Sequence, residues 1–104
     1  MTPVIVLTTV GTAFDVAALA RELVEQRLAA CVNVIPQIQS VYRWQGRIES
    51  DAEQLLLIKT VAERVDALQS ALLARHPYEV PEFVVMRMDE VRGPWREWLI
   101  DSVR

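Results

Sequence analysis

The sequence has few of the side chains that bind soft metals. Its 104 residues include one cysteine, Cys31, and one histidine, His76. A single cysteine excludes an intramolecular disulfide and a CxxC metal or redox motif. Because thiolate and imidazole are the usual ligands of copper and zinc, a transition-metal site in this chain would also need carboxylates, water or a second subunit.

Long apolar runs are also absent. The longest ones, such as Val4–Leu7 and Leu55–Ile58, are far shorter than the roughly 18 residues that a membrane-spanning helix needs. The first residues do not show the basic stretch followed by a long apolar region that directs a chain to secretion. We therefore expect a cytoplasmic protein with no membrane partner.

The chain has no excess of basic residues. Its formal net charge is −3, and its 11 Lys and Arg residues are scattered along the sequence. Nucleic-acid-binding proteins usually gather such residues into one basic face, so we expect no nucleic-acid partner. The length fits a single domain over residues 1–104 with one hydrophobic core.

Two helices are indicated by capping-box spacings, in which a threonine precedes an acid by three residues. These are Thr12–Asp15 and Thr60–Glu63, and each precedes apolar residues at three- and four-residue steps. We expect a helix to begin at each spacing. The second should end near Arg75, because the ring of Pro77 disfavours helical conformation at the residue before it.

The strands follow from apolar runs and alternation. Residues 4–7 predict the first strand, and Val32–Trp44 predicts a long second strand in which Pro36 marks a bulge or an edge position. Gln45-Gly46 is a two-residue turn that leads into a third strand ending at Lys59. This turn pairs Trp44 with Arg47 and, without a bulge, would pair Val32 with Lys59.

Two further elements complete the chain. Phe83–Met86 predicts a short fourth strand. Gly93-Pro94 then begins a short C-terminal helix, with Trp95, Trp98 and Leu99 expected on its buried side.

This order, βαββαβ, predicts an α/β (α+β) fold of the ferredoxin-like class, in which both helices cover one face of the sheet and strands one and three are central. Those two strands carry the continuous apolar runs that are typical of a sheet covered on both faces. The 13 residues of Val32–Trp44, at about 3.3 Å each, span about 40 Å, so the hairpin should project beyond its own domain. We expect a homo-oligomer that covers the second face and the hairpin, since exposed edges and aromatic surface favour aggregation. The alternative is a monomer with a mobile hairpin.

Several short motifs occur here in a fixed order. They are Ala29-Ala30-Cys31-Val32-Asn33 with Pro36, Ser40-Val41-Tyr42-Arg43-Trp44-Gln45-Gly46, Glu49, Lys59-Thr60 and His76-Pro77-Tyr78-Glu79-Val80-Pro81-Glu82. Together they cover nearly the whole chain and resemble the CutA divalent-cation-tolerance family. The resemblance implies a homotrimer, similar in fold to the nucleotide-sensing PII proteins, with a cleft between subunits near His76–Tyr78. It also implies a binding or sensing role in divalent metal ion homeostasis, copper included.

The resemblance also suggests which residues to examine for metal binding. The metal ligands proposed for the family are a cysteine at the end of the first strand and two consecutive histidines before Pro-Tyr. Those positions are Thr8, Arg75 and His76 here, so two of the three ligands differ. His76 and Cys31 remain as candidate ligands for Cu(II) or another divalent metal. The alternative role of His76 is to cap the C-terminus of a helix, and that of Cys31 is to pack in the core.

We expect Lys59, His76, Tyr78 and Glu82 to lie near the intersubunit cleft. Lys59 either pairs with an acid such as Glu82 or serves as an anchor for an anion. Arg75, next to His76, favours an anionic ligand over a cation. Tyr42 and Trp44, on the hairpin, are expected to contact a neighbouring subunit, because aromatic residues are enriched in such interfaces.

Three functional classes therefore compete. The first is a trimeric binding module in metal homeostasis, and its nearest alternative is a PII-like signalling trimer that binds a small anion or metabolite. The second is a structural scaffold without a small-molecule ligand. The third, an enzyme using His76 as a base beside Glu82, has little support because no nucleophile, base and orienting group assemble in the sequence. We expect no enzyme activity.

Overall fold

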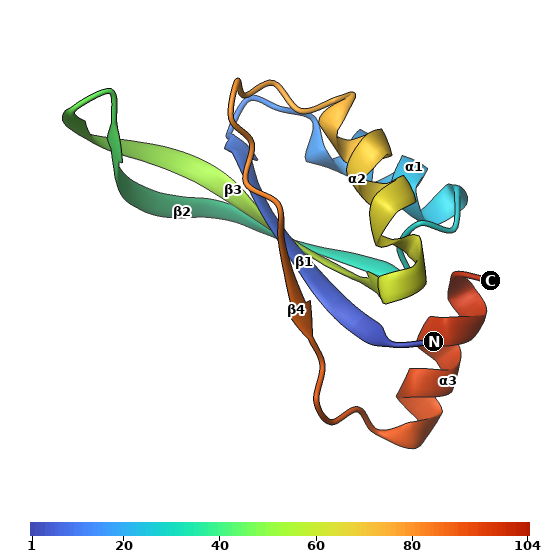
Figure 1. Cartoon of the computed structure of the whole chain (residues 1–104). Coiled ribbons are helices and arrows are strands. Elements are labelled where there is room, and N and C mark those ends of the chain that lie inside the picture. The colour runs from blue at the N-terminus through green and yellow to red at the C-terminus, as the bar shows by residue number, and fades with distance from the viewer.

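The computed structural model describes all 104 residues. Its elements are β1 (Pro3–Gly11), α1 (Val16–Glu25), β2 (Cys31–Trp44), β3 (Arg47–Val61), a 3₁₀ turn at Ala62–Arg64, α2 (Val65–Leu73), β4 (Val84–Arg87) and α3 (Gly93–Ser102). The four strands form one antiparallel sheet in the order β2-β3-β1-β4 (Figure 1). The predicted ferredoxin-like architecture, with strands one and three central, is confirmed.

Helices α1 and α2 lie together on one face of the sheet (Figure 1). Alternate residues of β1 and β3 point toward them, and Val6, Val10, Leu56 and Ile58 are completely or almost completely buried there. These side chains join apolar residues from both helices in the main hydrophobic core. Burying one such side chain contributes about 1.5–3 kcal/mol, so this core anchors the sheet.

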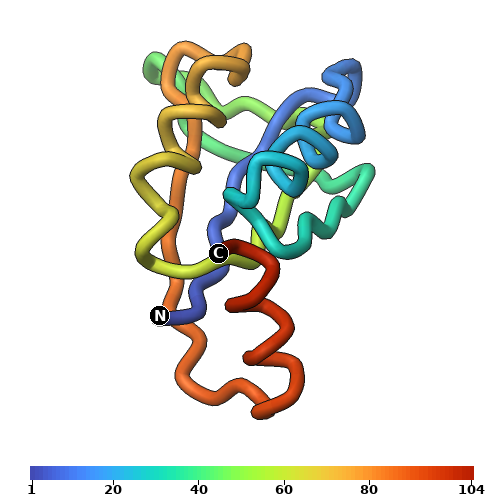
Figure 2. Tube along the Cα trace, turned by 90° about the vertical axis from the view of Figure 1, so that its right-hand side faces the viewer, coloured from blue at the N-terminus to red at the C-terminus, as the bar shows by residue number.

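The C-terminal helix α3 lies apart from the other two helices, at the end of the sheet where the N-terminus also lies (Figures 1 and 2). Leu99, Ile100 and Val103 form its buried side, packed in a second small core. Trp98 is 46% exposed, so the expectation that Trp98 belongs to the buried side is wrong. Trp95 packs against this core, and the Trp98 ring lies against the Trp95 ring at 5.8 Å between centroids.

Strands β2 and β3 extend as a hairpin well beyond the helices (Figure 1), which gives the molecule extents of 45 × 26 × 22 Å. Positive φ angles of 50° and 78° at Gln45 and Gly46 form the expected tight turn. Trp44 pairs with Arg47, as predicted. Lys59, however, pairs with Cys31, because a bulge after Ile35 shifts the register.

Both predicted helix starts need correction. Asp15, whose Oδ1 accepts from the Ala18 amide at 3.1 Å, caps α1 in place of Thr12. The second helix begins only at Val65, because Thr60 belongs to the end of β3. Glu63 instead accepts from the Thr2 amide at 3.1 Å, which ties the chain after β3 to the start of β1.

The face of the sheet opposite α1 and α2 is covered by neither of them (Figure 1), and only Trp95 of α3 reaches one end of it, near Lys59. Register pairs place Ile5 beside Met86, and Leu7 between Val84 and Leu57, on this face. We call it the open face. None of the helices is long and apolar enough to cross a membrane.

Candidate functional site

A hollow of about 810 Å³ lies where the hairpin meets the loop between α2 and β4. It is lined by Thr9, Gly11, Thr12, Ala13, Ser40, Tyr42, Trp44, Asp51, Ala52, Glu53, Pro77, Tyr78, Glu79, Val80 and Glu82. We call this the hairpin hollow. Its volume falls within the range of about 300–1,000 Å³ that is usual for small-molecule sites.

The loop over the hairpin hollow is tied to the sheet by Tyr78. Its hydroxyl donates to Glu53 Oε2 at 2.6 Å. Only 8% of Glu53 is exposed, so this is a partly buried charged hydrogen bond of the stronger kind. Burial first, and then the bond to Glu53, raise the pKa of the Tyr78 phenol. The prolines at 77 and 81 limit the freedom of the loop between them.

His76 supports the same loop from the helix side. Its Nδ1 accepts from the Tyr78 amide at 3.2 Å, so Nε2 carries the proton and donates to the Thr9 carbonyl at 2.9 Å. The Thr8 hydroxyl lies 3.3 Å from the same Nε2. Burial lowers the pKa of His76, although the Thr9 carbonyl and Glu53 oppose this shift. The imidazole is thus held neutral between β1 and the loop.

The hairpin supplies the opposite wall of the hollow. The Tyr42 hydroxyl donates to Asp51 Oδ2 at 2.5 Å across the two strands. This bond is the largest of the causes that raise the pKa of Tyr42 to about 12. Trp44, two residues further along β2, completes the wall.

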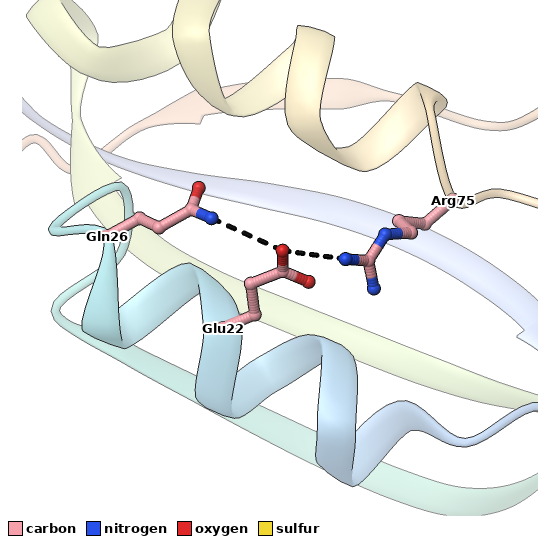
Figure 3. Close-up of polar contacts among 3 residues, drawn as sticks. All are labelled: Glu22, Gln26 and Arg75. Atoms are coloured by element: carbon pink, nitrogen blue, oxygen red, sulfur yellow. Dashed lines mark hydrogen bonds and ion pairs between the residues drawn. The ribbon is translucent and has the colours of Figure 1, made fainter.

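The basic residues of the sequence prediction lie elsewhere. Arg75 donates to Glu22 Oε1 at 2.7 Å, and the same oxygen accepts from Gln26 at 3.2 Å (Figure 3). Arg75 therefore links α2 to α1 and does not line the hairpin hollow. The Lys59 Nζ lies 5.8 Å from the centre of the Trp95 ring, a cation–π contact with α3.

The comparisons with known proteins identify the family. The model of the "CutA1 divalent ion tolerance protein" family matches residues 4–102. The chain belongs to this family. The "Divalent-cation tolerance protein CutA" of Thermus thermophilus is 43% identical over 98 residues, which is 94% of this chain and 95% of that protein. The crystal structure of CutA1 from Oryza sativa superimposes with a TM-score of 0.94 at 38% identity, covering 100% of this chain and 95% of the other.

Other CutA relatives are longer than this chain, or have names that state a cellular location. The "Protein CutA homolog" of Xenopus laevis is 48% identical over 82% of this chain, but the match spans only 56% of that protein. The chain thus spans about half the length of the animal relatives it matches. One relative from Oryza sativa is named chloroplastic, and a CutA of known structure from Archaeoglobus fulgidus is named periplasmic.

The CutA1 family name raises the question of a bound metal, and the residues of one chain do not fit one. No three His, Cys, Asp or Glu side chains are grouped so that they could hold an ion. Both ring nitrogens of His76 are engaged in hydrogen bonds. The thiol of Cys31 lies 3.7 Å from the amide oxygen of Asn33, on a strand position paired with Lys59.

The expected cleft residues therefore separate within one chain. Tyr78 and Glu82 line the hairpin hollow, and His76 borders it through its bond to the Tyr78 amide. Lys59 contacts α3 instead, so one chain brings together three of the four residues, and their common cleft between subunits stays a prediction. Tyr42 and Trp44, expected at a subunit interface, line the hollow.

Sequence reasoning missed the two acids that anchor the tyrosines. Glu49, Asp51 and Glu53 alternate with small or apolar residues on β3. In a strand, every second residue faces the same side, so this spacing indicates a row of acids on one side of the hairpin. Lys59 and Arg75 instead favour an anion site when only the sequence is considered.

Proposed function

We propose that this CutA1 family member is a homotrimeric binding module that takes part in cellular tolerance of divalent metal ions, copper among them, and that it is not an enzyme. The observation that carries the proposal is the family match over residues 4–102. The ionisable groups of the hairpin hollow are carboxylates and phenols, and both phenols donate to carboxylates, Tyr42 to Asp51 and Tyr78 to Glu53. No cysteine or histidine lines the hollow, so it forms no nucleophile activated by an imidazole and suits binding better than nucleophilic catalysis.

The open face supports the assembly. It presents aliphatic side chains of β1, β3 and β4, and β4 carries exposed Val84 and Met86. A contiguous apolar surface of this kind marks a protein–protein contact. The number of three subunits comes from the family resemblance. In this proposal the sheets meet through their open faces, and the hairpins, with Tyr42 and Trp44, reach the neighbouring subunit.

Metal contact, in this proposal, requires more than one subunit. His76 can offer a nitrogen to an ion only after one of its two hydrogen bonds breaks, and Cys31 belongs to no group of three such side chains within its own chain. Cys31 and His76 would therefore act with ligands from a neighbour. The cytoplasmic location remains a prediction, since the relatives carry both chloroplastic and periplasmic names.

A small anion is a weaker candidate ligand than it was from the sequence alone. The hairpin hollow is lined by Asp51, Glu53, Glu79 and Glu82, and no lysine or arginine lines it. Carboxylates repel an anion at short range. The scaffold without any ligand remains the second candidate, because the open face supports assembly whether or not a ligand binds.

Native mass spectrometry tests the assembly. We expect wild-type protein at three times the chain mass of 11.8 kDa. Leu57→Asp, which places a charge on the open face, should give monomers, because an unpaired buried charge is costly. Val24→Asp, at a residue 41% exposed on α1, is the matched control and should remain trimeric. A wild-type monomer, or a trimeric Leu57→Asp variant, would overturn the proposed assembly.

The same spectra test the metal. With excess Cu(II), we expect adducts on the trimer that are lost in Cys31→Ser or His76→Ala, while circular dichroism shows that both variants remain folded. Adducts that persist in both variants would overturn the assigned ligands. A trimer without adducts would favour the scaffold.

A further inference from the structure

The hairpin hollow combines aromatic rings with carboxylates. Tyr42 and Trp44 from β2 and Tyr78 from the loop contribute rings, and Asp51 and Glu53 contribute acids from neighbouring positions on one side of β3. Ring faces attract cations, by about 0.5–1 kcal/mol at exposed sites and more where water is excluded. Rings and carboxylates therefore favour the same kind of ligand, one that is positively charged and partly apolar.

Glu53 gives an independent indication of a ligand. Its side chain is more than nine-tenths buried, and Oε2 accepts the Tyr78 hydroxyl, whereas no hydrogen bond of the chain reaches Oε1. No fully buried side-chain oxygen lacks a partner, so Oε1 is accessible, and Glu53 lines the hollow. A carboxylate oxygen that belongs to a largely buried residue, is reached by solvent and lacks a hydrogen-bond partner can accept from a charged donor.

The spacing of the two acids restricts the ligand further. Asp51 and Glu53 are two residues apart on one strand, which sets their backbones about 7 Å apart. Each uses one oxygen for a tyrosine hydroxyl, Tyr42 for Asp51 and Tyr78 for Glu53, and leaves the other available. Two ammonium groups joined by a short methylene chain match this separation, and the methylenes would lie against the rings.

We propose that the hairpin hollow binds a linear aliphatic diamine or polyamine, with one ammonium group on Glu53 and the next on Asp51. An inorganic divalent ion fits less well, because no three acidic or metal-binding side chains converge there. The lining carboxylates disfavour an anion. The inference goes beyond the proposed function and does not depend on metal binding.

The test uses the wild-type protein in its native assembly and 1,4-diaminobutane as the probe. Binding is followed by NMR shifts of the Trp44 indole NH and by calorimetry. We expect saturable binding that weakens with added salt. The diol of the same length, 1,4-butanediol, should bind at least about tenfold more weakly, because it lacks the charge that the carboxylates recognise.

Single substitutions locate the site. Glu53→Gln and Asp51→Asn keep an acceptor oxygen for each tyrosine and should each weaken diamine binding about tenfold, since each removes one charge-assisted contact. Trp44→Leu should weaken it about threefold, the fold-change that matches a surface cation–π contact. Glu25→Gln, which removes an exposed acid on α1, is the matched control and should change nothing.

Three results would overturn the proposal. They are an absence of saturable binding, equal affinity for the diol, and equal weakening by Glu25→Gln and Glu53→Gln. An absence of binding overturns the proposal even where a neighbouring subunit fills the hollow, because the proposal is made for the assembled protein. None of these results bears on the trimer or metal tests, which measure mass and copper adducts.

Discussion

The two halves of β3 contrast within a single strand. From Leu55 to Thr60, every second side chain is buried on the face of the sheet that carries α1 and α2, whereas from Arg47 to Ala52 all but one residue are exposed on the hairpin. The two halves meet at Glu53 and Gln54, both buried. The Gln54 amide donates to the Gly11 and Phe14 carbonyls at 2.9 and 3.1 Å, which holds the chain between β1 and α1. The core thus stabilises one half of the strand, and the other half presents side chains for binding.

A matched pair of substitutions in the strands beside β3, at Val6 next to Ile58 and at Val41 next to Ser50, should give the largest difference between the two halves. Val6→Thr puts a hydroxyl into the fully buried core, and Val41→Thr makes the same change at a hairpin residue that is 68% exposed. Burying the hydroxyl should lower the free energy of unfolding by about 1–3 kcal/mol. Val41→Thr should change it by about 0.5 kcal/mol or less. Urea denaturation at one protein concentration measures both, and an equal loss would show that another chain covers this side of the hairpin.

Most of the fold could be predicted from the sequence, because periodicity reports burial. The apolar runs of β1 and β3 predicted central strands, and Gln45-Gly46 predicted the hairpin turn. The errors lie where a local signal competes with the sheet. The Thr60–Glu63 spacing is typical of a helix start, but Thr60 pairs with Val4 in the ladder, and its hydroxyl donates to the Leu28 carbonyl at 2.8 Å.

A second pair compares two tyrosine–acid hydrogen bonds, one at the edge of the core and one on the hairpin. Tyr78→Phe leaves the largely buried Glu53 without a hydrogen-bond donor and should lower the free energy of unfolding by about 1 kcal/mol, a value reduced for partial solvent access. In the Leu57→Asp background, which we expect to be monomeric, Tyr42→Phe should have no measurable effect, because its partner Asp51 is exposed in the single chain. Chemical denaturation of both variants, together with the loop amide shifts, checks this. A larger loss for Tyr42→Phe in the wild-type background would mean that the hairpin is buried in the assembly.

The candidate site was harder to predict than the fold, because it depends on contacts between distant segments. The sequence indicated Tyr78 and Glu82 through the stiff proline-bracketed loop, and both line the hollow. It could not show that Arg75 is bonded to Glu22 on α1, or that Lys59 lies over Trp95. Both residues suggested an anion site, and their actual contacts leave the hollow acidic. A charged residue close to a site residue in the sequence therefore need not point into the site, because the packing of the helices decides the direction of its side chain.

The smallest expected effect concerns pH, and it tests how His76 holds the loop before β4 against β1. Because the pKa of His76 is lowered in the folded chain, the unfolded chain binds a proton more readily. The contribution of His76 is thus fully present above its ordinary pKa of about 6.5 and is lost as pH falls below that value. Protonation would also place a second N–H at Nδ1, opposite the Tyr78 amide from which Nδ1 now accepts.

The denaturation midpoint should fall more between pH 7.5 and pH 5.5 in wild type than in His76→Gln, which keeps an amide donor for the Thr9 carbonyl but cannot titrate. Since the carboxylates are the same in both proteins, their contribution cancels, and His76 is the only histidine. Equal pH dependence in the two proteins would show that the imidazole does not hold the loop against β1.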